Sequence, residues 1–433
     1  MDGGKMELLA PAGDLEKLRF ALDYGADAVY FGGEVGSLRA GAGNLSAADV
    51  HEGVSYAHAL GKKAYMAANI YAHEDDFGPL RGFLAEVGGA GIDGYIVSDP
   101  GVLALVRETV PDAAIHLSTQ ASATNAAAAA FWRDAGVSRI IAARELSLPE
   151  IGRMAEAVPE VEIEAFAHGA MCVSYSGRCL LSAVMTGRDA NRGACAHPCR
   201  YGYALVEEKR PGEYFPVEQD VRGTYILNSK DLCMIGHIGR MAAAGIRSLK
   251  IEGRMKSLYY VAVVVKAYRQ AIDAFYAARP EDAVLRPAPS GATGASEGAG
   301  AGMGAGGRGL EAWMRELRSV SHRHFTTGFY LGRPEGEGQS QERGGYSRTH
   351  DFVGVVKEYR PESGTALVEQ RNKFSRGERV EIFGPEGEGF EQTLGRMWDE
   401  EGAPVESAPH PRQRVVVEVA EPVGRGYLLR RGV

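Results

Sequence analysis

The sequence predicts an α/β protein whose main unit is a (β/α)8 barrel of the TIM type, followed by a small C-terminal β-barrel. Short apolar runs alternate with amphipathic helical patterns over the first two-thirds of the chain. Such alternation is typical of parallel strands joined by helices. Eight runs of this kind favour a closed barrel over the alternative, an open doubly wound sheet. No glycine fingerprint follows the first run, which further disfavours the open sheet.

The expected strands, in order, are short and end in polar or turn residues. They are Glu7–Leu9, Ala28–Phe31, Ala64–Ile70, Gly94–Val97, Ile115–Gln120, Arg139–Arg144, Glu162–Ala167 and Ser248–Ile251. Amphipathic stretches such as Leu15–Tyr24 and Ala123–Ala135 supply the helices between them. Because active sites of these barrels lie at the C-terminal strand ends, the polar residues there are candidates. They are Asn69, Asp99, Gln120, Arg144, Glu145, His168, Glu252 and Arg254.

The chain divides into four parts. Residues 1–285 form the barrel, with a cysteine-rich insertion at about 169–246 that joins strands seven and eight and therefore begins at the barrel mouth. Residues 286–309 are rich in Gly and Ala and are expected to be a flexible insertion. A helix and connector follow over 310–349. Short strands between Gly and Pro turns then predict a small β-barrel over 350–433, a possible RNA-binding domain.

The bulk composition is that of an ordinary globular protein. The net charge of −8 gives no general attraction to nucleic acid, so a polyanionic partner needs a local basic patch. No stretch approaches the ~20 apolar residues of a membrane span, and the N-terminus lacks the cations of a signal peptide. We therefore expect a cytoplasmic protein whose cysteines are reduced thiols or ligands.

The cysteines give the clearest indication of function. Four of the five fall in one segment, as Cys172, Cys179, Cys195 and Cys199, with spacings of six, fifteen and three residues. Four thiolates suit either tetrahedral zinc or a 4Fe–4S cluster, and the spacing does not choose between them. A position at a barrel mouth favours the redox cluster. Cys233 lies in a helix-like stretch after Asn228–Lys230 and is expected to be an apolar core residue. It is the substitute ligand if one of the four clustered cysteines does not bind the metal.

Other candidate residues have two interpretations each. His168 is either an acid–base group or hydrogen-bond donor to the cluster, or a satisfied histidine at the rim. Glu252 and Arg254, from one strand end, either bind a carboxylate ligand or brace each other. In the C-terminal domain, one loop mixes cations with an aromatic ring and either holds RNA or is a solvated hairpin tip. Its residues are Arg371, Lys373, Phe374 and Arg376.

Four motifs carry a family resemblance. The run Glu164–Ser182 resembles the signature of the collagenase-like peptidase family U-32, and Glu7–Asp14, Gln120–Ser122 and Lys250–Arg254 are similar to its recurrent motifs. The better understood members look like oxygen-independent hydroxylases that carry a 4Fe–4S cluster and act on tRNA, ribosomal RNA or a quinone precursor. The resemblance is greatest to the tRNA branch, which forms 5-hydroxyuridine at the wobble position and requires prephenate.

The resemblance implies specific ligands and partners. The cluster ligands would be the four clustered cysteines, and the partners tRNA and a small carboxylate metabolite such as prephenate. Two rival interpretations are a peptidase, as the family name says, and a zinc-stapled RNA-binding protein without catalysis. Against a peptidase, the chain has no His-Glu-x-x-His helix and no Gly-x-Ser-x-Gly elbow, and Ser176 is the only serine in a suggestive setting.

Overall fold

The structure is a computed structural model, and it describes most of the chain. The described residues are 5–37, 43–172, 174–201, 204–206, 214–216, 230–278, 307–332 and 347–433. The expected flexible insertion lies outside the described residues up to position 306, as do Asn228 and Ser229 of the expected cap. In the described part of the chain, no helix is long and apolar enough to cross a membrane.

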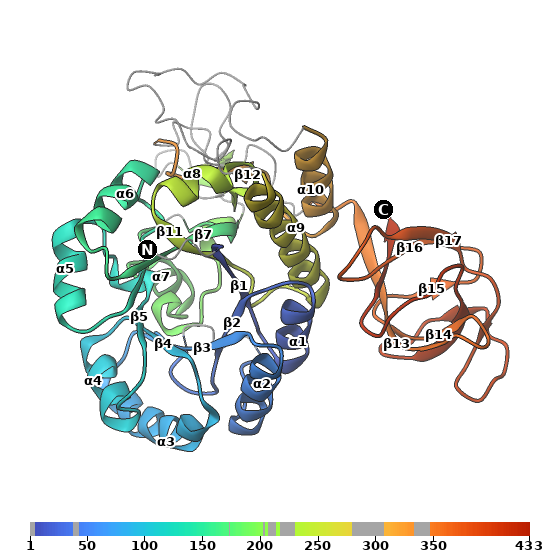
Figure 1. Ribbon diagram of the computed structural model, residues 1–433, viewed down its shortest axis with the longest axis horizontal. Helices are drawn as coiled ribbons and strands as arrows, with labels where there is room; N and C mark the ends of the chain where they lie inside the picture. Colours follow the sequence, from blue (N-terminus) through green and yellow to red (C-terminus); the bar gives the residue numbers. More distant parts are fainter. Residues whose placement is uncertain are drawn as a thin grey trace.

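Eight parallel strands close into a barrel, which confirms the predicted fold and excludes the open sheet (Figure 1). Closure occurs because the last strand pairs in parallel with both the first and the seventh. The strands are β1 (Glu7–Pro11), β2 (Ala28–Gly32), β3 (Lys63–Ala68), β4 (Gly94–Val97), β5 (Ile115–Leu117), β6 (Arg139–Ile141), β7 (Glu162–Ala170) and β11 (Ile246–Ile251). Several expected strands end two or three residues early, because the chain turns out of the sheet at the mouth.

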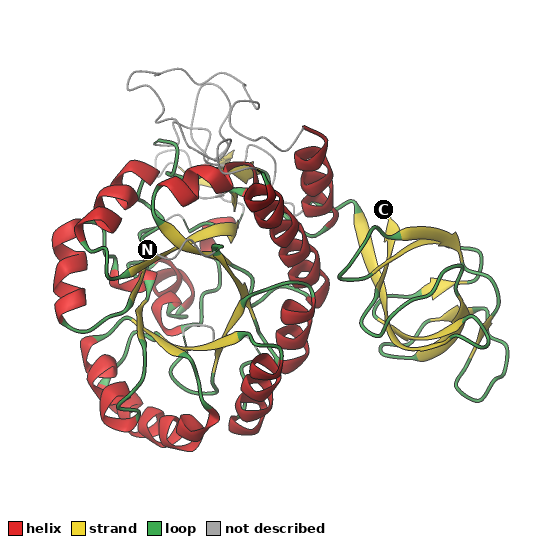
Figure 2. Ribbon diagram, viewed as in Figure 1, coloured by secondary structure: helices red, strands yellow, loops and turns green. Residues whose placement is uncertain are grey.

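An outer ring of helices covers the barrel (Figure 2). These are α1 (Leu15–Asp23), α2 (Ala47–Ala59), α3 (Phe77–Val87), α4 (Pro100–Thr109), α5 (Ala126–Asp134), α6 (Leu148–Ala157), α8 (Ile238–Ala243) and α9 (Leu258–Ala277). Side-chain caps begin several of them: Asp14 accepts a hydrogen bond from the Lys17 amide, and Ser46 forms a capping box with Asp49. Such caps satisfy backbone donors that a helix start leaves free, so they fix where each strand-to-helix turn ends.

The insertion after β7 departs from the prediction at Cys233. The long β7 pairs antiparallel with β10 (Asp231–Cys233), which in turn pairs with β12 (Phe325–Thr326). Cys233 therefore lies in a strand and not in a helix, because its backbone bonds to the extended end of β7 opposite His168. The insertion also contains α7 (Leu181–Thr186) and a separate hairpin of β8 (Ala204–Val206) and β9 (Tyr214–Pro216).

The C-terminal domain is an antiparallel half-barrel. Its seven-stranded sheet has the order β17-β16-β21-β13-β14-β20-β18. The strands are β13 (His350–Arg360), β14 (Thr365–Gln370), β16 (Arg379–Phe383), β17 (Phe390–Thr393), β18 (Met397–Trp398), β20 (Arg414–Glu418) and β21 (Leu428–Gly432). A separate pair joins β15 (Phe374–Ser375) to β19 (Ser407–Ala408). Valine, leucine and phenylalanine side chains fill the core between them.

The two domains share a packed junction beside α9 and α10 (Gly307–Ser319), as Figure 1 shows. The rings of Tyr259 and Phe352 stack with centroids 5.4 Å apart. Arg430 is buried there and bonds to Glu316 of α10 and to Glu381 of the C-terminal sheet. Apolar contacts and a satisfied buried cation together fix how the C-terminal domain sits on the barrel.

Candidate functional site

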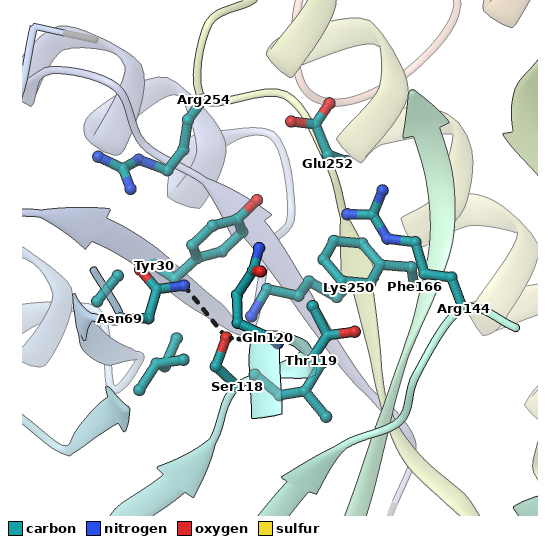
Figure 3. A pocket seen from close by; sticks show the side chains of 13 residues that line it. Tyr30, Asn69, Ser118, Thr119, Gln120, Arg144, Phe166, Lys250, Glu252 and Arg254 are labelled. Atoms are coloured by element: carbon teal, nitrogen blue, oxygen red, sulfur yellow. Dashed lines mark hydrogen bonds between the residues drawn. The ribbon is translucent and has the colours of Figure 1, made fainter. Parts of the chain in front are cut away.

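A cavity opens at the C-terminal ends of the barrel strands, where the site was expected (Figure 3). The space within it, including the open mouth, is about 520 Å³. The lining is polar at the rim and aromatic below. It comprises Tyr30, Ala67, Asn69, Ile96, Ser118, Thr119, Gln120, Ile141, Arg144, Phe166, Lys250, Glu252 and Arg254.

The floor of the cavity is a buried ionic cluster inside the barrel. Lys250 Nζ lies 2.7 Å from Glu164 Oε1, and the same carboxylate lies 3.2 Å from Arg139 Nη1. Burial lowers the pKa of Lys250, and the charge of Glu164 opposes that change. Lys250 was not among the predicted site residues. The signal was a charged residue between two apolar residues of an expected strand, Leu249 and Ile251, which is costly to bury unless it is paired or functional.

Two arginines, Arg144 and Arg254, line the walls of the cavity. The Arg144 guanidinium lies over the Phe166 ring, 3.8 Å from its centroid, and donates to the Ala170 carbonyl. Arg254 is buried and donates to the Ser37 hydroxyl at 2.7 Å and to the Asn44 amide oxygen. The lining thus contains three cations and the carboxylate of Glu252, and one of the cations, Lys250, is already paired with Glu164. With the amides and hydroxyls of the rim, this arrangement suits a small anion.

The cysteine-rich segment covers part of the mouth, as the topology predicted. The Ser176 amide donates to Glu145 Oε1 at 3.1 Å, and the Ser122 hydroxyl donates to the Ser176 carbonyl at 2.9 Å. Gly177 has φ +72°, and a Cβ there would lie 2.5 Å from Gln120 Oε1, so glycine is required for this close approach. The segment is therefore held directly above residues that line the cavity.

A second anchor ties the segment to the loop after β3. Arg192 forms two hydrogen bonds with the carboxylate of Asp76, at 2.7 and 2.9 Å, and donates to the Tyr71 carbonyl. The Tyr71 amide in turn donates to the Asn191 carbonyl. The ion pair lowers the pKa of Asp76, which keeps the pair charged well into acid.

Among the residues that the structure describes, none of the four clustered cysteines forms a disulfide. Cys172 is exposed, whereas Cys179, Cys195 and Cys199 are half-buried. The His197 amide donates to Cys195 Sγ at 3.4 Å. Within the described residues, no three His, Cys, Asp or Glu side chains are gathered closely enough to hold a metal ion. Soft thiol donors on one segment suit zinc or an iron–sulfur cluster in chemistry, and their role as ligands stays a prediction.

His168 does not line the cavity. Its ring is 1% exposed and is enclosed by the rings of Tyr260, Tyr268 and Phe325. Burial lowers its pKa to about 3, so the imidazole is neutral near pH 7. This placement does not suit an acid–base role in the cavity; it agrees with the alternative of a satisfied histidine. Next to it, burial raises the pKa of the Cys233 thiol to about 11.

The C-terminal loop differs from the expectation at two residues. Phe374 is 0% exposed in the domain core, so its ring cannot stack on a base, and that prediction was wrong. Arg371 is bound to Glu16 of α1 and to Glu369. Arg376 lies 3.3 Å from Glu406, and Lys373 is exposed. Sequence alone did not show that the aromatic ring of this hairpin points inward.

Comparison with known proteins agrees with this architecture. The sequence profile described as Peptidase family U32 matches residues 13–340, and that of the Peptidase family U32 C-terminal domain matches residues 348–430. The chain belongs to peptidase family U32. The boundary between the two matches falls at the junction between the barrel and the half-barrel.

Relatives in this family carry different names. The chain is 40% identical over 429 residues to tRNA hydroxylation protein P1 of Bacillus subtilis, covering 99% of this chain and 95% of the relative. It is 38% identical over 270 residues to a 23S rRNA 5-hydroxycytidine synthase of Escherichia coli, covering 62% of this chain and 40% of that protein. It is also 32% identical over 399 residues to a collagenase of Porphyromonas gingivalis, covering 89% and 88% respectively.

Proposed function

We propose that this chain is an RNA hydroxylase that acts on tRNA. The observation that carries the proposal is a cationic cavity at the barrel mouth with a four-cysteine segment held over it. The names of two relatives, a tRNA hydroxylation protein and an rRNA hydroxycytidine synthase, support RNA hydroxylation as the reaction class. The finer assignment is formation of 5-hydroxyuridine at the wobble position, without molecular oxygen and with prephenate required.

The cysteines are proposed to hold a 4Fe–4S cluster. Replacing C5–H of a pyrimidine by C5–OH, with the oxygen taken from water, would release two electrons and two protons, and a bound cluster would pass the electrons one at a time to an external electron acceptor. The ligands would be Cys172, Cys179, Cys195 and Cys199. The segment carrying them is braced against Glu145, Ser122 and Asp76 of the barrel, which holds it over the cavity.

The cavity is proposed to bind the small carboxylate. Arg144 and Arg254 on the walls contribute positive charge, and Tyr30 supplies an aromatic surface. Lys250 on the floor is paired with Glu164. A dicarboxylate with an unsaturated ring, such as prephenate, has matching groups. The amides of Asn69 and Gln120 at the rim can orient its remaining oxygens.

The peptidase alternative has less support. The hydroxyl of Ser176 is buried and hydrogen-bonds with Thr119 Oγ1 at 3.4 Å. In the part of the chain that the structure describes, no histidine hydrogen-bonds to Ser176, so it lacks a general base. A serine without a base is a poor nucleophile for peptide bonds.

The test is to measure iron content and visible absorption of protein purified without oxygen. We expect a brown protein whose absorption is lost in Cys172→Ser, Cys179→Ser, Cys195→Ser and Cys199→Ser. Cys233→Ser is the matched control and should keep the cluster, because a buried core thiol tolerates an isosteric change. A colourless protein with stoichiometric zinc would reject the cluster.

The activity is tested separately by nucleoside analysis of tRNA. Cells lacking this gene should lose 5-hydroxyuridine, and the wild-type gene should restore it while the four ligand variants should not. Restoration by the ligand variants would show that hydroxylation does not use the cysteines.

A further inference from the structure

The cysteine-rich segment is basic although the whole chain is acidic. Residues 172–201 contain four arginines, one aspartate and neither lysine nor glutamate, whereas the chain has a net charge of −8. A negatively charged protein can bind a polyanion only through a local patch of this kind. The segment is therefore the place to look for an anionic partner of macromolecular size.

Two of these arginines are available at the surface. Arg178 and Arg188 are exposed, and neither forms an ion pair with another residue of the described ranges. Arg192, in contrast, is held by Asp76 and serves as an anchor. Exposed cations without a carboxylate partner can bind phosphate at no cost of breaking an internal pair.

Large apolar side chains gather on the same segment. Tyr175 is 69% exposed, Leu180 68%, Val184 80% and Tyr201 52%. Tyr71, which contacts the segment through Asn191, is 59% exposed. Single exposed apolar residues are normal, but a group of them on one segment marks an interaction surface. We call Tyr71, Tyr175, Arg178, Leu180, Arg188 and Tyr201 the mouth face.

Rings combined with unpaired arginines fit single-stranded RNA. Unpaired bases stack on tyrosine rings, and arginines take the phosphates between them. The C-terminal domain is a weaker candidate for binding phosphates, because residues 348–433 contain 15 acidic and 13 basic residues. Several of its arginines are already paired, such as Arg379 with Glu391 and Arg396 with Glu418.

We propose that an unpaired RNA loop docks on the mouth face, with Tyr175 stacking on a base and Arg178 and Arg188 binding phosphates. The inference rests on the proposed function and names where its RNA binds. An enzyme that modifies a base takes it out of its stack or acts on an unpaired strand, and Gly177, next to Arg178 and two residues from Tyr175, closely approaches Gln120 of the cavity lining.

The experiment measures binding of the full chain, purified without oxygen, to a fluorescent RNA stem–loop by anisotropy over a range of salt. A fully paired RNA duplex is the comparison ligand. Tyr175→Ala should weaken stem–loop binding by roughly fivefold to 150-fold, the range for losing one stacked base. The double variant Arg178→Ala/Arg188→Ala should reduce the log–log salt slope by roughly 1.4.

Matched controls separate docking from general damage. Tyr175→Phe keeps the ring and should bind like wild type. Phe131→Ala removes an equally exposed ring, 66% exposed on α5, and should have no effect. Lys373→Ala/Arg376→Ala removes two cations of the C-terminal loop and should leave the slope unchanged.

The outcomes separate the mouth face as the RNA site from the proposed function. Normal stem–loop affinity in both mouth-face variants, or a reduced slope only in the C-terminal variant, overturns the mouth face as the RNA site. Equal loss of affinity in Tyr175→Ala and Phe131→Ala would also overturn it. If the wild-type chain binds neither the stem–loop nor the duplex, the proposed function itself is overturned.

Discussion

The cavity floor provides a quantitative test of how the barrel tolerates buried charge. Lys250→Met removes the cation while keeping most of the side-chain length. Glu164 is then left 0% exposed, but Arg139 remains 3.2 Å from it. Breaking a buried pair costs about 3–5 kcal/mol. Because one cation remains, we expect the lower end, about 3 kcal/mol, which corresponds to a fall in melting temperature of roughly 6–12 °C.

A second substitution should recover part of that loss. In Glu164→Gln/Lys250→Met a neutral amide replaces the carboxylate. No uncompensated charge then remains at the cavity floor. Arg139 keeps Glu7 at 2.6 Å and Glu162 at 2.6 Å as partners. We expect the double variant to be more stable than Lys250→Met, with a coupling energy of roughly 0.5–3 kcal/mol.

The assay is thermal and urea unfolding of the four proteins of the cycle. Lys63→Met is the control, because Lys63 lies on β3 but is exposed. If the cavity binds prephenate as proposed, isothermal titration should show weaker binding in Lys250→Met. A double variant no more stable than Lys250→Met alone would refute the coupling between Glu164 and Lys250.

Three further predictions concern stability. Because burial lowers the pKa of His168 to about 3, only the unfolded chain takes up its proton as pH falls below about 6.5; stability should therefore decline between pH 6.5 and 3. Urea unfolding at pH 7 and pH 5 should show a smaller decline in His168→Asn. Arg430→Met should cost about 1.5–3 kcal/mol by calorimetry, because buried charged hydrogen bonds to Glu316 are lost. Phe374→Ala should cost about 3–5 kcal/mol in urea unfolding; an unchanged midpoint would contradict its core position.

Most of the barrel was predictable because its signals are local. Alternating strands and helices, with caps such as Asp14 and Ser46, are encoded within short windows. β10 was not predictable, because its three residues become a strand only by pairing with the end of β7. The apolar residues after Cys233 looked helical, and they are: Ile235–His237 form a short 3-10 helix that leads into α8, whereas pairing with β7 holds Asp231–Cys233 in a strand.

The candidate site was predictable in part for the same reason. Asn69, Gln120, Arg144, Glu252 and Arg254 line the cavity as expected for polar residues at strand ends. Asp99 instead caps α4, and His168 faces a cluster of aromatic rings behind the sheet. Strand-end position indicates which residues reach the mouth, but the direction of each side chain depends on packing that the sequence does not display.

The position of the cavity beneath the mouth face has a consequence for the order of events. An RNA docked above the opening would obstruct entry of a small molecule from that side. The small carboxylate would then have to load first and its product leave last, giving compulsory-order kinetics. Excess RNA would inhibit turnover by trapping chains that had not yet loaded, whereas excess carboxylate would not.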